Sequence, residues 1–187
     1  MNSLHLQVCA SPEWRQIVEE KILPEALGRV DLGTDVIEIG PGPGFTTDVL
    51  RGVAARLTAV ELDPELAASL EARMTGSNVR VICGDAISLD LPTGSFTGGA
   101  SFHMLHHIET AEDQDRVFCE LARVLEPGGV LVAADGVENE GSRAFHEDDI
   151  YNPIDPDDLG VRLATAGFVS VDIRTHELGW VCSAICA

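Results

Sequence analysis

The feature that most constrains the fold of this chain is a regular alternation of short apolar runs with amphipathic helical stretches. The runs read DVIEIG, RLTAVELD, NVRVICGD, GGASFHML and GGVLVAAD. Between them, DPELAASLEARM and EDQDRVFCELARVL have helical spacing, and in the second Val117, Leu121 and Val124 fall on one face before a Pro-Gly-Gly stop. Strand and helix repeated in this way predict an α/β fold, with a mostly parallel sheet and helices on both faces.

The last third of the chain departs from this rhythm. DDLGVRLATAGF predicts one more helix, and VSVDIRTHEL and WVCSAICA follow as two strand-like runs with only a tight connection between them. Two strands joined so closely are antiparallel, because a parallel pair needs a long crossover. We therefore expect the sheet to end in an antiparallel hairpin.

A chain of 187 residues can bury one sizeable core, so we expect a single domain over residues 1–187. Residues 1–30 predict a helical lead-in, because Ser11 can cap a helix that has Pro12 at its first position. Residues 136–156 are acidic, rich in turn formers and without clear periodicity. We expect a surface loop there on the substrate side of the sheet, either disordered or functional.

The charge of the chain disfavours several kinds of partner. Its 31 acidic residues against 12 basic ones give a formal net charge of −19, and no basic stripe is visible. Nucleic acid and anionic membranes are therefore poor partners. Because the chain shows neither an export signal nor an apolar run long enough to span a bilayer, we expect a cytoplasmic protein without membrane association. The pattern leaves the oligomeric state open.

The cysteines are an odd set without a CxxC pair. They are Cys9, Cys83, Cys119, Cys182 and Cys186. Most lie in apolar surroundings, which favours reduced thiols in the core over a disulfide framework or a zinc site. We assign no metal ligands from the sequence.

The first apolar run leads into the turn GPGPG, whose glycines are Gly40, Gly42 and Gly44. In an open α/β sheet, such a turn lets the backbone approach a ligand at the carboxyl ends of the strands. Phe45 stands where a dinucleotide fingerprint has its third glycine, and no Lys-Ser or Lys-Thr pair completes a P-loop. Pro41 and Pro43 lack the backbone N–H groups that would bind a pyrophosphate. The turn therefore favours a ligand with little phosphate charge, such as a nucleoside joined to an amino acid through a sulfonium.

Acidic residues follow the next two runs. Glu61 can accept hydrogen bonds from both hydroxyls of a ribose, although folds that bind NAD use the same device. Asp85 can accept from an adenine amino group while the Ala86 amide donates to the ring. Both acids could instead be helix caps, and we assign Asp63 to capping. Two acids beside a phosphate-poor turn favour adenosine without phosphate.

The strings VIEIGPGPG, VELD, GDA, SFHMLHHI and LARVLEPGGVLVAAD occur in the order and spacing of the class I S-adenosylmethionine-dependent methyltransferases, which the chain resembles over residues 34–187. NSLHLQVCASPEW also looks like the lead-in of small actinobacterial members. The resemblance implies a Rossmann-like sheet of seven strands with the last one antiparallel, and S-adenosyl-L-methionine as cofactor.

The resemblance also implies which residues hold this cofactor. The amino-acid end would be bound by Glu38 and the glycine turn, the ribose by Glu61, and the adenine by Asp85 with Ala86. The implied set is Glu38, Gly40, Gly42, Gly44, Glu61, Leu62, Asp85, Ala86 and Ser101. Glu38 could instead be a buried structural acid that nearby amides satisfy.

Candidate bases lie in SFHMLHHI, which follows the fourth run. Methyl transfer is an in-line displacement, so alignment in a water-poor pocket supplies much of the rate, and a base is needed only for a protonated acceptor. Histidine suits that task, and we take His103 and His107 as candidate catalytic residues, ahead of His106. A structural role or a place on the cofactor shelf is the alternative for each.

Three further side chains lie in segments that could close over the site. They are His5, His146 and Tyr151. We expect each of them to be a solvated surface residue.

The combined prediction is a methyltransferase that acts on a small-molecule acceptor. One alternative is an rRNA adenine dimethyltransferase, because VIEIGPGPGFTT also looks like the opening of those enzymes, but SFHM stands in place of their Asn-Leu-Pro-Tyr type motif. An NAD(P)-dependent oxidoreductase is disfavoured by the prolines of the turn. A partner protein that binds the cofactor without catalysis remains open.

Overall fold

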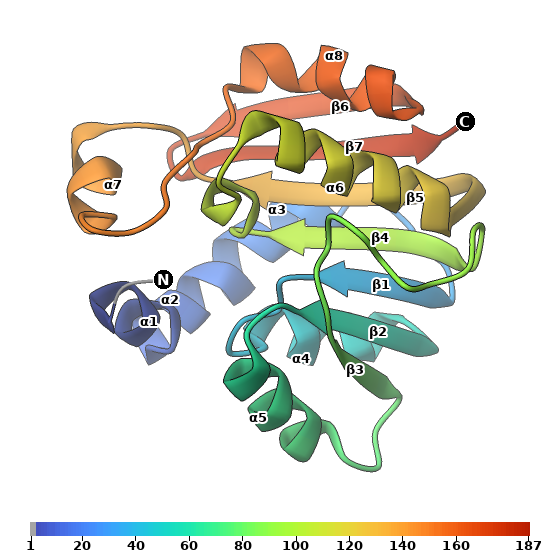
Figure 1. Cartoon of the computed structure of the whole chain (residues 1–187), viewed down its shortest axis with the longest axis horizontal. Helices are drawn as coiled ribbons and strands as arrows, with labels where there is room; N and C mark the ends of the chain where they lie inside the picture. Colours follow the sequence, from blue (N-terminus) through green and yellow to red (C-terminus); the bar gives the residue numbers. More distant parts are fainter. Residues whose placement is uncertain (1–2) are drawn as a thin grey trace.

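The computed structural model describes residues 3–187, in which one seven-stranded sheet forms the centre (Figure 1). The strands are β1 Asp35–Ile39, β2 Arg56–Glu61, β3 Val79–Cys83, β4 Phe96–Phe102, β5 Leu125–Asp135, β6 Phe168–His176 and β7 Gly179–Cys186. Their order is β3-β2-β1-β4-β5-β7-β6, and β7 runs antiparallel to both β5 and β6 while the other pairs are parallel. The predicted Rossmann-like α/β sheet with a terminal hairpin is therefore confirmed. The insertion of β7 between β5 and β6 is a further feature that the hairpin pattern did not specify.

Helices cover both faces of this sheet. The described part of the chain contains α1 Ser3–Cys9, α2 Pro12–Ile17, α3 Leu23–Leu27, α4 Phe45–Val53, α5 Pro64–Met74, α6 Ala111–Val124, α7 Glu140–Phe145 and α8 Pro156–Ala166, with a π-helical segment η1 Val18–Ile22 and a 3₁₀ turn η2 Leu105–His107. In Figure 1, α6 and α8 lie in front of the sheet, and α3 and α4 lie behind it. The helices predicted at α5, α6 and α8 are present.

Alternate side chains of the central strand β1 pack on opposite faces of the sheet. Val36 packs with Leu50 of α4 and Ile22 of η1, whereas Ile37 and Ile39 belong to the apolar cluster that α6 and α8 cover. All five side chains are at most 1% exposed. A strand buried on both sides reads as a continuous apolar run, and this explains why DVIEI lacks the polar alternation of a half-exposed strand.

The N-terminal lead-in is helical, as predicted, but it widens into the π segment η1. The Leu23 amide donates to the Val18 carbonyl, five residues back instead of four. Pro24 follows, and a proline ring in a regular α-helix clashes with the carbonyl four residues before it. The π turn accommodates Pro24 without ending the helical path. Helix α1 also lies within the stretch predicted to be helical, although only the helix that begins after Ser11 was predicted from a specific cap.

Residues 136–156 are not a loop throughout, which corrects the expectation from periodicity. They contain the short helix α7, whose start is a reciprocal cap: Asn139 Oδ1 accepts from the Ser142 amide and Ser142 Oγ accepts from the Asn139 amide. A helix of six residues has too few turns for an apolar stripe, so its only local signal is the cap.

The expectation that the cysteines lie in the core is correct only at the end of the chain. All five thiols are unbridged, but Cys83 and Cys119 are exposed and Cys9 is half-buried, while Cys182 and Cys186 are buried in β7. Cys83 is the last residue of the edge strand β3. None of the helices in residues 3–187 has the length and apolar character needed to cross a bilayer.

Candidate functional site

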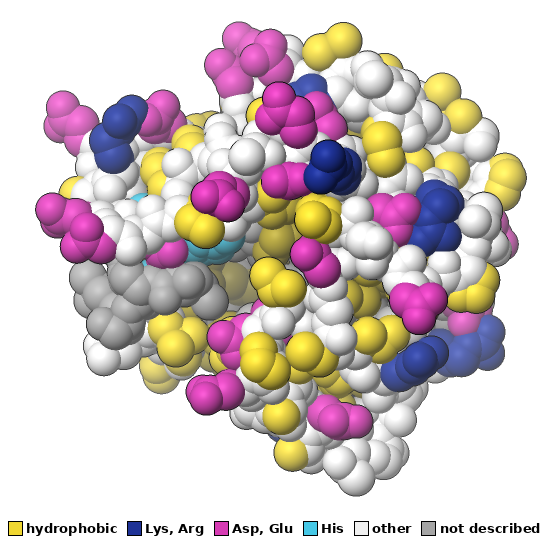
Figure 2. Space-filling model, viewed as in Figure 1, with side chains coloured by type: hydrophobic (Ala, Val, Ile, Leu, Met, Phe, Trp, Pro, Cys, Tyr) yellow, Lys and Arg dark blue, Asp and Glu magenta, His cyan; other side chains and the backbone are white. Residues whose placement is uncertain are grey.

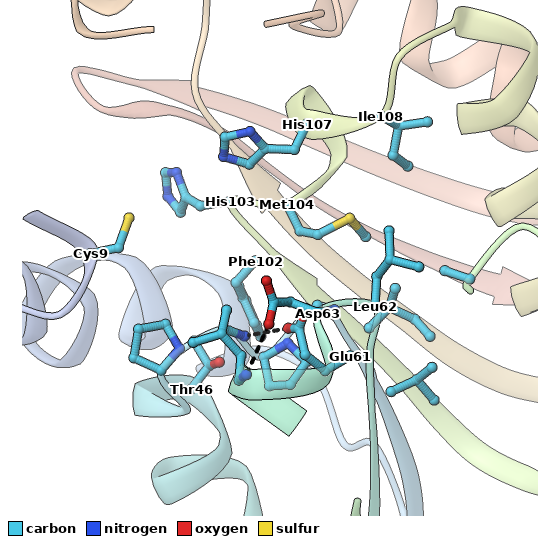
Figure 3. A pocket seen from close by; sticks show the side chains of 18 of the residues that line it. Cys9, Thr46, Glu61, Leu62, Asp63, Phe102, His103, Met104, His107 and Ile108 are labelled. Carbon is cyan, nitrogen blue, oxygen red and sulfur yellow. Dashed lines mark hydrogen bonds between the residues drawn. The ribbon is translucent and has the colours of Figure 1, made fainter. Parts of the chain in front are cut away.

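A cavity of about 630 Å³ opens at the carboxyl ends of β1, β2 and β4 (Figure 3). One wall is formed by the glycine turn after β1 and the segment after β2, and the opposite rim carries His103 and His107. Leu6 of α1 and Trp14 of α2 close the cavity from the N-terminal side, and Ile150 contributes from the loop after α7. The cavity therefore uses the end of the sheet at which ligands bind in open α/β folds.

The glycine turn adopts a left-handed backbone at each glycine. The φ values are +66° at Gly40, +52° at Gly42 and +84° at Gly44, a region that other residues rarely adopt. A side chain at Gly40 would collide with Met104, and one at Gly44 would collide with Leu70 of α5. A Cβ at Gly42 would meet no atom within 4 Å, so this glycine alone faces open space. Close packing therefore requires glycine at positions 40 and 44, whereas glycine at position 42 leaves the cavity open to a ligand.

Glu61 joins the end of β2 to this turn. Its carboxylate is 8% exposed and accepts from the Gly42 amide at 2.9 Å and from the Asp63 amide at 3.0 Å (Figure 3). A carboxylate has about four acceptor positions, so two remain for a ligand. The alternative role as a helix cap belongs to Asp63, two residues later, which is the N-cap of α5.

The two residues predicted to bind the adenine, Asp85 and Ala86, also line this cavity. Asp85 and Ala86 follow β3, and Asp85 Oδ1 accepts from the Ile87 amide at 3.0 Å. No helix begins there, so Asp85 is part of a turn and not a helix cap. Leu62 also lines the cavity and is 66% exposed, a large apolar side chain available to a ligand.

Glu38 and Ser101 do not line the cavity. Alternation along β1 directs Glu38 toward α4, where its carboxylate accepts from the Thr46 hydroxyl and from the Thr47 hydroxyl at 2.6 Å. Burial raises the pKa of Glu38 to about 7. Ser101 is fully buried in β4, and its hydroxyl has no partner among the residues that the structure describes. Of the two, Glu38 adjoins the cavity through Thr46, which does line it.

His103 lies at the rim with a strained backbone. Its φ of +51° is uncommon for a residue with a side chain, and such strain recurs at functional sites. Its ring meets Trp14 edge-on, with the ring centroids 5.1 Å apart, and Nδ1 lies 3.9 Å from Asp135 Oδ1. Burial lowers the pKa of His103 to about 4, so the imidazole is neutral at pH 7.

The expectation of solvated surface residues at His5, His146 and Tyr151 is wrong. His5 is 4% exposed and His146 is 8% exposed, and Tyr151 stacks on His146 with centroids 4.1 Å apart. The cause is tertiary, because α1 and the segment after α7 fold onto η2. Burial, together with neighbouring histidines, lowers the pKa of His5 to about 4 and that of His107 to about 3.

Two residues of the site were missed. Asp135 ends β5, is 1% exposed, and accepts from His106 Nδ1 and from the His106 amide. Trp14 covers the cavity and touches His103. Asp135 could have been found, because it ends an apolar run in the same way as Glu61. Trp14 gave no such signal, since an apolar residue in an amphipathic helix indicates core packing.

The residues present fit a nucleoside cofactor that carries no pyrophosphate. The turn presents one open glycine and two prolines without N–H groups, and the buried carboxylate of Glu61 keeps lone pairs directed at the cavity. The volume lies within the range of roughly 300 to 1,000 Å³ of small-molecule sites. Fold and site together define a class of α/β enzyme that binds such a cofactor at the carboxyl ends of its parallel strands.

A family model described as a methyltransferase domain matches residues 37–133, more than half of the chain. The chain belongs to the class I S-adenosylmethionine-dependent methyltransferases, whose cofactor is S-adenosyl-L-methionine.

Relatives and solved structures agree with this membership. A probable S-adenosylmethionine-dependent methyltransferase of Mycobacterium tuberculosis is 30% identical over 161 residues, which cover 83% of this chain and 54% of that protein. A probable ribosomal RNA small subunit methyltransferase A of Haloarcula marismortui is 39% identical over 93 residues, 46% of this chain and 32% of that protein. The chain thus spans about half the length of the first relative, and less of the second. The structure of a SAM dependent methyltransferase from Aquifex aeolicus has the same fold, with a TM-score of 0.70 at 18% identity over 98% of this chain and 97% of that one.

Proposed function

We propose that this chain transfers a methyl group from S-adenosyl-L-methionine to a small-molecule acceptor bound between the glycine turn and helices α1 and α2. The observation that carries the proposal is the hydrogen bond from the Gly42 amide to Glu61. This bond joins Gly42, the glycine of the turn that faces open space, to the buried carboxylate of Glu61 in one wall of the cavity. His103 and His107 lie on the opposite rim.

The cofactor contacts that we propose follow from positions along this wall. Glu61 would accept from the ribose hydroxyls, Asp85 with Ala86 would bind the adenine, and Leu62 would pack against the nucleoside. The glycine turn would hold the amino-acid end. Glu38 would act on this end through Thr46, since its own carboxylate lies beneath the turn.

When bound, the cofactor supplies a methyl group on a sulfonium, which is ready for in-line displacement. The chain contributes alignment and a dry cavity, because Leu6, Trp14 and Ile150 cover the site with apolar surface. His103 is neutral, so its ring can accept a hydrogen bond from an acceptor hydroxyl or amine. A pKa near 4 makes it a weak base, and we assign it mainly to positioning the acceptor.

A small acceptor suits the charge and shape of the chain better than RNA. Acidic side chains spread over the face in Figure 2, where few basic ones accompany them, and histidine surface is visible in the hollow. With a net charge of −19, the chain lacks the counterion release that drives binding to a phosphate backbone.

Calorimetry of S-adenosylhomocysteine binding tests the cofactor contacts. We expect Glu61→Ala to weaken binding roughly 10-fold to 100-fold, because hydrogen bonds to a charged group contribute about 1.5–3 kcal/mol. Asp90→Ala, which removes an exposed acid outside the cavity, is the matched control and should bind like the wild type. Equal affinity in the Glu61→Ala and Asp90→Ala proteins would remove the ribose assignment.

The acceptor class has its own test. The protein is incubated with methyl-labelled cofactor and, separately, with a small-metabolite extract and with 16S-type ribosomal RNA. We expect label in the metabolite fraction and none in the RNA. Label in the RNA alone would replace the small-molecule proposal by the dimethyltransferase alternative.

A further inference from the structure

Four histidines from three separate segments meet beside the cofactor cavity. They are His5 of α1, His106 and His107 of η2, and His146, which directly follows α7. One ligand atom from each lies within 4.8 Å of the corresponding atoms of the others. Three of the four residues are buried, and the binding of a nucleoside cofactor gives no reason for such a cluster.

Two of these rings are oriented through their Nδ1 atoms. Nδ1 of His106 donates to a carboxylate oxygen of Asp135, and Nδ1 of His146 donates to the Ser142 carbonyl at 2.6 Å. Because both partners can only accept, each ring carries its proton on Nδ1 and has a lone pair on Nε2. Metal-binding histidines are held in this way by a carboxylate or a backbone carbonyl.

The opposite nitrogens of these rings are left without partners. Nε2 of His106, Nε2 of His146 and both ring nitrogens of His107 are buried and accept no hydrogen bond within the described part of the chain. Leaving such groups unpaired is costly, and a cation placed among the three rings would satisfy one nitrogen of each. His5 adds a fourth ring, whose Nδ1 lies 3.4 Å from Asp149 Oδ2.

We propose that His5, His106, His107 and His146 bind one divalent transition-metal ion, with Zn²⁺ the best match. Imidazole nitrogen suits zinc, whereas calcium and magnesium prefer oxygen ligands. A tetrahedral zinc site with Zn–N distances of about 2.0–2.1 Å places its nitrogens about 3.4 Å apart. Modest rotations of the four side chains close the shell from their present separations of up to 4.8 Å.

The charge around the cluster favours a cation. Asp135 is buried against His106, and its carboxylate oxygens lie on the Nδ1 atom and the backbone amide of that residue. Asp149 lies on the other side, against His5. Four neutral ligands leave the ion with its full charge, and these two carboxylates partly compensate it.

Four protein ligands leave no open coordination position, which is typical of structural zinc sites. The ion would hold α1 and the segment after α7 against η2, over the mouth of the cavity. His107 is then a ligand and not a base, which replaces the role predicted for it from sequence. This proposal stands independently of the methyl transfer.

The test is zinc uptake by the intact chain after it has been stripped with a chelator. Zn²⁺ is titrated in competition with a chromophoric chelator, and the X-ray absorption spectrum of the zinc-loaded protein is recorded. We expect one ion per chain in a shell of nitrogen at about 2.0–2.1 Å. Absence of stoichiometric uptake, or sulfur at about 2.3 Å from a thiolate, would overturn the proposal.

Variants locate the site. His107→Ala and the His107→Ala/His146→Ala double variant should lose at least 10-fold in zinc affinity, and Asp135→Asn should lose 10-fold to 100-fold by disturbing the orientation of His106. His176→Gln is the matched control, because it removes a histidine outside the cluster and should bind zinc like the wild type. If the double variant, folded by circular dichroism, keeps wild-type affinity, or if His176→Gln loses as much as His107→Ala, these four histidines are not the site.

Discussion

At the scale of single residues, Glu38 is a buried acid whose ionisation makes stability depend on pH. It is 1% exposed, and burial raises its pKa from 4.5 to about 7 despite the hydrogen bonds from Thr46 and Thr47. Because the folded pKa exceeds the unfolded one, folding takes up a proton between these values. Stability from this group is therefore greatest below about pH 4.5 and is lost as the pH rises through about 7.

We predict that Glu38→Gln removes this dependence. Between pH 4.5 and 7 the free energy of unfolding of the wild type should fall relative to that of Glu38→Gln by an amount on the order of 3 kcal/mol. Urea denaturation at a series of pH values measures the difference. Subtracting the two curves cancels the titration of the other acids, so parallel curves would show that Glu38 is ionised throughout this range.

At the scale of elements, the start of helix α5 shows two acids of one short segment with different hydrogen-bond partners. Asp63 accepts from the Glu65 amide at 2.8 Å and the Leu66 amide at 3.0 Å, which satisfies two of the unpaired amides at the start of α5. Glu61, two residues earlier, is turned toward the glycine turn. The two acids of ELD therefore have different partners: Asp63 caps α5, whereas Glu61 accepts from the glycine turn, where we propose that it binds the ribose.

We predict that Asp63→Ala lowers the free energy of unfolding by about 1 kcal/mol, the usual cost of losing an N-cap. Glu71→Ala is the control, because it removes an exposed acid from the last turn of the same helix, far from the cap, and should change stability by less than about 0.5 kcal/mol. Denaturant midpoints at constant slope provide the measurement. Equal losses in both variants would mean that the capping bonds contribute nothing net.

At the scale of the whole molecule, the excess of acidic residues opposes compaction. A net charge of −19 on 187 residues repels itself at low ionic strength, and salt screens this repulsion as the Debye length falls from about 30 Å at 0.01 M to about 8 Å at 0.15 M. We predict that the midpoint of thermal unfolding rises over this range, by about 2–4 °C for each 1 kcal/mol of repulsion that is screened. Sodium and potassium chloride should act alike, and a midpoint that falls with salt would show that specific ion pairs outweigh the net charge.

Much of the fold could be predicted because local sequence patterns specify its strands, helices and terminal hairpin. The buried run DVIEI, the helical stripe in α6 and the tight link between β6 and β7 each determine their own geometry within a few residues. Helix α7 was not predicted, since it is too short to show a repeating apolar face. The position of β7 between β5 and β6 depends on contacts between distant segments, which a periodicity does not record.

The candidate site divides in the same way. The turn GPGPG and the acids after β2 and β3 lie at strand ends, where the sequence by itself determined both their place and the kind of ligand they suit, because parallel strands bring their carboxyl ends to one edge. Only the tertiary structure determined where the histidines lie and that four of them meet. His5 and His146 are 141 positions apart, and the folding of two short helices onto η2 buried both beside His106 and His107. No local spacing could predict that meeting, since it results from packing between segments far apart in the chain.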